Sequence, residues 1–210
     1  MKPWRNTNAV VPMKHVLGLA CLIVCGAAQD LLQAGDQPAD LATLMSLLSR
    51  VEHVEADYRE IVTSDLIATA ISQRGRLIYQ APDHLQRVND DGKGFVLAGQ
   101  QMHLIAGEEV VRELNVADLP PLQALVGALR AIFAGDLKTL RAAYELDYRA
   151  MAKHWELDLQ PADPGLLMVF RRLHLIGTGA TVTSIETIEA NGDTRTMQMT
   201  LRRRRPAVLQ

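Results

Sequence analysis

Aromatic side chains and cysteines are both scarce in this sequence, and each shortage limits what the protein can be. Aromatic residues make up 4% of the 210 residues, so methionine and aliphatic side chains must line most of any apolar pocket. The two cysteines, Cys21 and Cys25, both lie near the start of the chain. The rest of the sequence has no cysteine for a disulfide, so its fold must be stable without that cross-link.

The sequence also lacks the motifs of common catalytic and metal sites. It has no G-x-S-x-G elbow, and Gly177-Thr178-Gly179 is too short to be a phosphate-binding loop. The histidines beyond the leader show neither HExxH nor Cys/His ligand spacing: His53, His84, His103, His154 and His174. We therefore expect that the protein is not an enzyme and that it needs no cofactor and no metal.

The first 28 residues have the pattern of a secretory signal peptide. Lys2, Arg5 and Lys14 precede an apolar run from Val16 to Cys25, and the small residues Gly26-Ala27-Ala28 follow it. A membrane-spanning helix needs roughly 20 apolar residues, about twice the length of this run. We therefore expect cleavage after residue 28 and export to the periplasm.

Two alternatives remain for this leader. Met13-Lys14-His15 would by itself make a short basic start, so we favour Met13 as the true first residue. The alternative to cleavage is a lipoprotein signal, in which one of the two cysteines is acylated. The bulky Val24 before Cys25 stands where such a signal needs a small residue, which favours cleavage.

The chain without residues 1–28 is acidic, with 19 basic against 24 acidic residues and a net charge of −5. Such a chain is a poor binder of nucleic acid. One segment departs from this balance, because Arg202 to Arg205 are four consecutive arginines before Pro206. We interpret 202–210 as a solvated basic tail; contact with anionic lipid or a partner is the alternative.

The remaining length suits one domain, which we place at 40–201 after a flexible segment at 29–39. Asp40 precedes apolar residues at helical spacing, so the domain is predicted to begin with a helix. Turn residues then separate short apolar runs between residues 71 and 114, which indicates an antiparallel meander.

A second helical region interrupts these strands. Pro120-Pro121 ends the meander, and apolar residues follow at helical spacing up to Phe133, with a shorter helix predicted at 137–143. Strands are predicted again from Tyr144 to Leu201. Because a regular alternation of strand and helix is missing, we expect one strongly curved antiparallel sheet with helices against one face.

In the order and spacing of these segments the chain resembles the LolA-like family of outer-membrane lipoprotein carriers, within its divergent LolA-related branch. The resemblance extends from about Leu41 to Leu201. The segments that carry it are Val54-Glu55-Ala56-Asp57-Tyr58-Arg59-Glu60, Gly75 to Leu85, Phe133-Ala134-Gly135-Asp136-Leu137, Trp155 to Pro161 and Glu189-Ala190-Asn191-Gly192-Asp193.

This resemblance implies a mainly β, α+β fold: a half-open barrel whose concave apolar face holds acyl chains beneath a helical lid. It implies a periplasmic carrier or chaperone that takes a lipoprotein, or another acylated lipid such as a glycolipid, from an inner-membrane exporter to an outer-membrane acceptor. We expect a monomer. The alternative is an envelope sensor or scaffold that binds lipid with the same fold and does not transport it.

Alternating strand residues are the candidates for the cavity lining: Tyr58, Val62, Leu77, Tyr79, Leu85, Phe95, Leu97, Trp155, Leu157, Met197 and Met199. The lid candidates are Leu125, Leu129, Ile132 and Phe133. A filled core would produce the same alternation. In the family an arginine before the proline that follows the second strand latches the lid. That position is Ala81 here, so Arg74 and Arg76 become the candidate latch, with solvated charge as the alternative.

Overall fold

The structure, a computed structural model, describes residues 37–64 and 67–206. The predicted signal peptide and most of the segment 29–39 lie outside the described residues. Among the helices in the described part, none has both the length and the apolar character of a membrane span.

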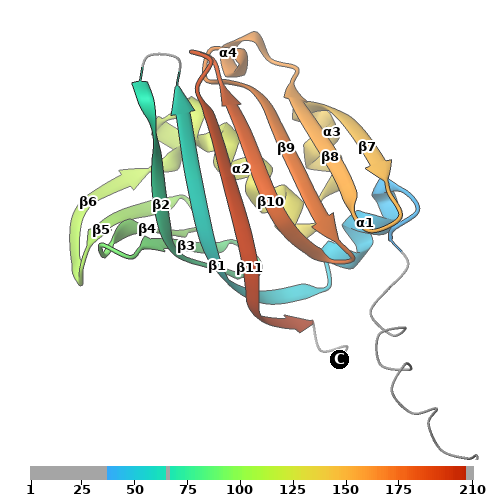
Figure 1. Cartoon of the computed structure of the whole chain (residues 1–210), viewed down its shortest axis with the longest axis horizontal. Helices are drawn as coiled ribbons and strands as arrows, with labels where there is room; N and C mark the ends of the chain where they lie inside the picture. Colours follow the sequence, from blue (N-terminus) through green and yellow to red (C-terminus); the bar gives the residue numbers. More distant parts are fainter. Residues whose placement is uncertain (1–36, 65–66, 207–210) are drawn as a thin grey trace, which may run out of the picture. The chain divides into compact units, whose positions relative to one another are not determined.

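Eleven antiparallel strands form one sheet in the order β6-β5-β4-β3-β2-β1-β11-β10-β9-β8-β7. From the centre outward the first half contains β1 (Val51–Ser64), β2 (Ile67–Gln80), β3 (His84–Asn89), β4 (Lys93–Ala98), β5 (Gln101–Ala106) and β6 (Glu109–Asn115). From the other edge inward the second half contains β7 (Tyr144–Ala150), β8 (Trp155–Pro161), β9 (Phe170–Thr178), β10 (Thr181–Glu189) and β11 (Thr194–Pro206). The predicted curved, unclosed antiparallel sheet is confirmed (Figure 1).

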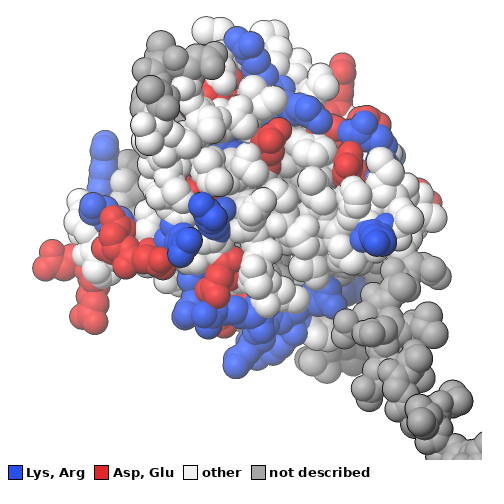
Figure 2. Space-filling view, viewed as in Figure 1, with Lys and Arg blue, Asp and Glu red and all other residues white. Residues whose placement is uncertain are grey.

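Pairing of β11 with β1 joins the two halves at the centre of the sheet. The pairing runs from Thr63 opposite Thr194 to Val51 opposite Pro206. The four arginines at 202–205 continue β11 as exposed residues; Arg203 to Arg205 pair with β1, and Arg202 lies at a register shift. Arg202 Nε lies 2.6 Å from Asp57 Oδ2 on β1. Figure 2 shows basic side chains gathered near the place where β11 ends in Figure 1.

The helices are α1 (Leu41–Leu48), the 3-10 helix η1 (Val116–Asp118), α2 (Pro120–Ala134), α3 (Leu137–Ala143) and α4 (Pro164–Leu167). The predicted start of α1 is confirmed, because the Asp40 side chain accepts a hydrogen bond of 2.7 Å from Thr43 N. The short α4 interrupts the region from Tyr144 to Leu201 in which the sequence predicts strands. Asp163 caps it, and Pro164 occupies its first position, where a missing N–H costs nothing.

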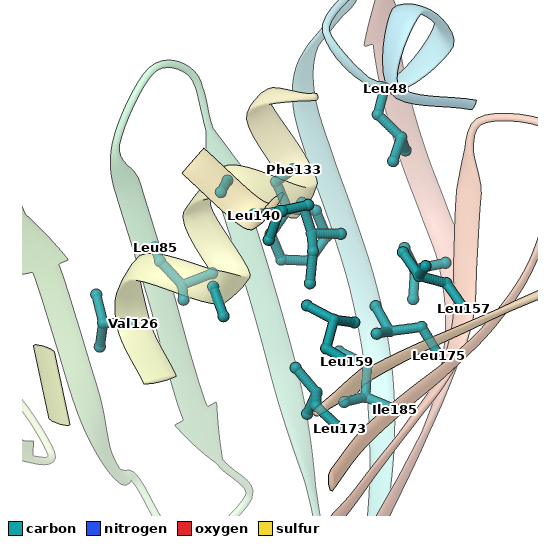
Figure 3. Packing of buried hydrophobic residues seen from close by; sticks show 14 of the residues in the cluster. Leu48, Leu85, Val126, Phe133, Leu140, Leu157, Leu159, Leu173, Leu175 and Ile185 are labelled. Atoms are coloured by element: carbon teal, nitrogen blue, oxygen red, sulfur yellow. The ribbon is translucent and has the colours of Figure 1, made fainter. Parts of the chain in front are cut away.

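The core lies between the helices and the inner face of the sheet. Trp155, Leu157 and Leu159 alternate along β8 and are fully buried, as are Leu173 and Leu175 on β9. The helices contribute further buried side chains: Leu44, Leu48, Ile132, Phe133 and Leu140. Figure 3 shows part of this cluster, packed between strands and helices.

The end of α2 is fixed against α1 by a close backbone contact at Gly135. This residue caps α2 with φ of 68°, a conformation that residues with a Cβ rarely adopt. A Cβ at this position would lie 2.1 Å from Met45 O and 2.8 Å from Ser49 N, both at the end of α1. The junction therefore needs glycine for two independent reasons.

We expect Gly135→Ala to lower the free energy of unfolding by about 2 kcal/mol or more, because it combines left-handed strain with a backbone clash. Urea unfolding measures the change. The matched control is Gly127→Ala in the middle of α2, where a new Cβ would meet nothing within 4 Å. This control should raise the unfolding free energy by about 0.5–1 kcal/mol through helix propensity. Equal effects of the two substitutions would contradict the proposed junction.

An ion-pair network covers the other face of β7, β8 and β9. Asp158 is 5% exposed, and its carboxylate accepts a hydrogen bond from Arg172 Nε. Its oxygens also lie 2.8 Å from His174 Nδ1 and 2.9 Å from Arg149 Nη2. Burial by itself would raise the pKa of Asp158, but the hydrogen bonds from Arg172 and His174 outweigh it and hold this pKa below its usual value.

A lowered pKa in the folded state makes the Asp158 carboxylate stabilising at neutral pH. This contribution is fully present above the unfolded-state pKa of about 3.9 and is lost as the pH falls through the lower folded-state pKa. We therefore expect Asp158→Asn to cost about 2 kcal/mol of unfolding free energy at pH 7, and this cost to shrink as the pH falls through the folded-state pKa of Asp158. Urea unfolding as a function of pH tests this.

The control for Asp158→Asn is Asp147→Asn on β7. The Asp147 side chain is 66% exposed and lies 3.9 Å from Arg149, so its removal should change the unfolding free energy by less than about 0.5 kcal/mol. The loss of unfolding free energy in Asp158→Asn could also stay constant down to the pH of acid unfolding. That result would mean that the Asp158 side chain does not stabilise the fold through its ionised form.

Candidate functional site

A cavity of about 420 Å³ lies between α2 and the inner face of the sheet. Val126, Leu129 and Phe133 of α2 line one side of it. The apolar residues opposite come from both halves of the sheet and from the segment before β9: Leu77, Leu85, Phe95, Met102, Val169, Phe170, Leu173, Ile185 and Met197. Leu85, Val126, Phe133, Leu173 and Ile185 are labelled in Figure 3. The cavity thus lies across the centre of the sheet, where its two halves meet.

Five polar residues also line the cavity, and we call them the polar stripe: Glu60, Arg87, Thr187, Glu189 and Arg195. Arg87 binds Glu60 through both oxygens, with Nη1–Oε1 at 3.2 Å and Nη2–Oε2 at 2.6 Å. Arg195 Nε donates to Glu189 Oε1, and its Nη1 lies 4.0 Å from Glu60 Oε2. The stripe therefore runs from β3 through β1 and β11 to β10 as a chain of ion pairs.

Arg87 is fully engaged within this stripe. Its Nε donates to the Tyr58 hydroxyl at 3.0 Å, and its guanidinium lies 4.7 Å from the centre of the Tyr58 ring. Burial would lower the pKa of Arg87, but hydrogen bonds to Glu60 and Tyr58 outweigh that effect and raise this pKa above its usual value. The guanidinium therefore stays charged, which balances the Glu60 carboxylate at 3% exposure.

The helix α2 is held over the sheet by contacts at several points. Arg130 Nη2 donates to Asp83 O at 3.1 Å and also to Gly99 O, so it joins α2 to the β2–β3 and β4–β5 turns. Phe133 stacks on Tyr79 of β2, with ring centres 5.0 Å apart. From β7, the Tyr144 hydroxyl donates to Ala124 O at 2.9 Å. Both halves of the sheet therefore hold this helix.

Burial also shifts the tyrosine hydroxyls beneath α2. Burial raises the pKa of Tyr144 to about 12, because its phenolate would lie in an apolar environment. The pKa of Tyr79 is raised as well, mainly by burial and then by the nearby Asp83, against a smaller opposite effect of Arg130. Both hydroxyls stay protonated at neutral pH, so Tyr144 remains a donor to α2.

Six of the predicted binding residues line this cavity: Leu77, Leu85, Phe95, Leu129, Phe133 and Met197. Tyr58 and Tyr79 lie beside it, the first bound to the polar stripe and the second stacked on Phe133. Met199 lines a smaller cavity near α1 instead. Val62 is half-buried on β1. The other predicted binding residues with described side chains belong to the filled core and have no exposed surface: Leu97, Ile132, Trp155 and Leu157.

The side chain of Leu125 lies outside the described residues, so its predicted place in the lid has no structural description. Arg74 and Arg76 are exposed, on the face of β2 opposite Leu77, and Arg76 lies 3.5 Å from Glu55. Within the described residues neither has a hydrogen bond or ion pair to α2. The polar contact of α2 with the first half of the sheet is made by Arg130, and the binding role of all these residues stays a prediction.

Several lining residues were not among the sequence candidates: Val126, Val169, Phe170, Leu173, Ile185 and the polar stripe. Alternation along β9 and β10 could have suggested Leu173 and Ile185. The stripe had no comparable signal, because Arg87 and Glu60 are 27 positions apart in sequence and meet only across three strands.

The architecture is thus a curved antiparallel sheet with a helix over an internal, mostly apolar cavity. The sequence matches the family described as outer membrane lipoprotein carrier protein LolA-like over residues 33–203. Because this match covers most of the chain, the protein belongs to the LolA-like family, and the predicted family is confirmed.

The comparison with solved structures finds distant similarities. A LolA superfamily protein from Nitrosomonas europaea is 8% identical with a TM-score of 0.42, covering 84% of this chain and 96% of that one. A DUF1329 family protein from Desulfovibrio piger is 9% identical with a TM-score of 0.42, covering 79% and 92%. No curated protein matches the sequence. Membership of the family therefore rests on the sequence match.

We expect Arg130→Gln to loosen α2 from the sheet, because both hydrogen bonds to the β2–β3 and β4–β5 turns are lost. Amide hydrogen exchange in α2 should accelerate by about tenfold or more, equivalent to ~1.4 kcal/mol. The control is Arg141→Gln, at an exposed position in the last turn of α3. Unchanged exchange in α2 of Arg130→Gln would show that this arginine does not hold the helix.

Proposed function

We propose that the protein is a periplasmic carrier that holds acyl chains of a lipoprotein, or of another acylated lipid, in the cavity beneath α2. The observation that supports this most is the cavity itself, which has a volume of about 420 Å³ and mostly apolar walls. It is covered by α2, which Arg130 and Tyr144 join to the two halves of the sheet. In this proposal the cargo comes from an inner-membrane exporter and passes to an outer-membrane acceptor.

The energetics of acyl burial suit a carrier. Burial of one methylene group yields roughly 0.8 kcal/mol, so a sixteen-carbon chain gains on the order of 12 kcal/mol. Three such chains would gain about 35 kcal/mol, above the ceiling of about 18–21 kcal/mol for non-covalent affinity. Full enclosure of every chain would therefore prevent release, whereas partial burial permits both uptake and delivery.

The contacts of α2 with the sheet are also compatible with opening. Arg130 and Tyr144 bond to backbone carbonyls, and these groups can exchange their partners for water when the helix moves. No buried ion pair needs to be separated in these two contacts. We infer that α2 is the lid and that its movement admits and releases the chain.

Filling the cavity should weaken binding. We expect Leu129→Trp, at a half-buried position of the cavity wall, to weaken binding of a fluorescent fatty acid by about tenfold or more, because the indole takes space that the chain needs. Fluorescence titration of the purified protein measures the affinity. The control is Val111→Trp, 60% exposed on the edge strand β6, which should leave the affinity unchanged.

Transport requires a second measurement, because an envelope sensor with the same fold would also bind the probe. Depletion of a carrier should strand acylated cargo at the inner membrane. Normal distribution of cargo in depleted cells, together with normal binding in vitro, would favour the sensor or scaffold. If the protein bound no fatty acid and no acylated molecule copurified with it, the lipid-binding proposal itself would fail.

A further inference from the structure

The volume of the cavity limits how much acyl chain it can hold. A cavity of about 150 Å³ is filled by benzene, which scales to roughly 25 Å³ for each carbon. On this scale 420 Å³ holds on the order of seventeen carbons. One long acyl chain therefore fits, whereas three chains of sixteen carbons would need roughly three times this volume.

The exposure of the lining residues distinguishes the inner part of the cavity from its mouth. Leu85, Met102 and Leu173 are between 0% and 4% exposed and mark the inner part. The Arg195 side chain, which lines the same cavity, is 43% exposed, and that of Glu189 is 28% exposed. The mouth therefore lies where β10 ends and β11 begins, at the solvent-facing end of the polar stripe.

The two arginines of the stripe differ in their free hydrogen-bond donors. All three nitrogens of Arg87 are engaged, by Tyr58 and by Glu60. In Arg195 only Nε donates, to Glu189. Among the described residues, no hydrogen bond is found for its Nη1 or Nη2, and Nη1 is 4.0 Å from Glu60. Arg195 therefore has donors left for an incoming acceptor at the mouth.

We propose that the cavity holds one acyl chain at a time, inserted tail first, and that Arg195 binds the oxygen acceptors of its head group. This inference rests on the proposed lipid binding and adds the number of chains, their direction and the head-group contact. A tail in the inner part lies against mostly apolar walls and against the Arg87–Glu60 ion pair, whose hydrogen bonds are already made within the protein. An ester, carboxylate or phosphate oxygen at the mouth meets the guanidinium.

Calorimetry of the full-length protein with saturated fatty acids of 10 to 20 carbons tests the capacity. We expect one chain per protein and an affinity that rises by about fourfold for each added carbon, then levels off near sixteen to eighteen carbons. Two or three chains per protein would overturn the single-chain inference, and the proposed carrier would stand. Absence of binding at every length would instead contradict the proposed function.

The head-group contact is tested with Arg195→Gln. We expect it to weaken binding of hexadecanoate by about tenfold or more and to have little effect on hexadecanol, whose head lacks a carboxylate. The control Arg112→Gln is exposed on β6, away from the cavity lining, and should bind as the unaltered protein does. Equal losses for hexadecanoate and hexadecanol would indicate a damaged cavity and overturn the head-group assignment, as would no loss at all.

A one-chain lysophospholipid with a sixteen-carbon tail separates the possible sources of these oxygens. Tighter binding of hexadecanoate would assign a free carboxylate to the mouth, and tighter binding of the lysophospholipid would assign an ester or phosphate. Either result, if sensitive to Arg195→Gln, supports the contact. Unfolding midpoints of the variants show whether the fold is preserved, so a loss of binding can be separated from a loss of structure.

Discussion

The structure depends on how the concave apolar face of a curved antiparallel sheet is covered. A sheet of eleven strands cannot close its inner face by itself while β6 and β7 remain unpaired edges, so helices must cover it. Near β8 the buried side chains of Trp155, Leu157 and Leu159 belong to the filled core. Under the middle of α2 the core is not filled, and the cavity is the part of the concave face that the protein leaves unfilled.

The polar stripe is the second constraint, because it places charge inside a mostly apolar enclosure. Glu60 is nearly inaccessible, and a lone carboxylate there would be strongly destabilising. Arg87 removes that cost by binding both carboxylate oxygens, and Tyr58 in turn orients Arg87. Arg195 and Glu189 continue the chain to solvent. The cavity consequently has mostly apolar walls, with an internally paired charge at Glu60 and Arg87 and partly exposed charges at its mouth.

Local sequence signals predicted the elements well where a short-range cause determines them. Asp40 caps α1, Gly135 ends α2, and frequent turn residues indicate the meander. The helix α4 is too short for a periodic signal. The alternation that identified Leu77 and Leu85 as cavity residues also selected Trp155 and Leu157, which are in the filled core. Alternation shows which face of a strand is buried. Cavity-lining residues and residues of the filled core both lie on that face, so alternation cannot separate them.

By itself, the sequence determined the family, the kind of sheet and the inward-facing residues, because periodicity, caps and turns act over a few neighbouring residues. Only the tertiary structure decided which of those residues meet a cavity, that Arg130 holds α2 against the sheet, and that Glu60, Arg87 and Arg195 form one stripe. Those contacts join strands and helices that are far apart in sequence, and they depend on the curvature of the sheet and the position of α2. No local pattern encodes either.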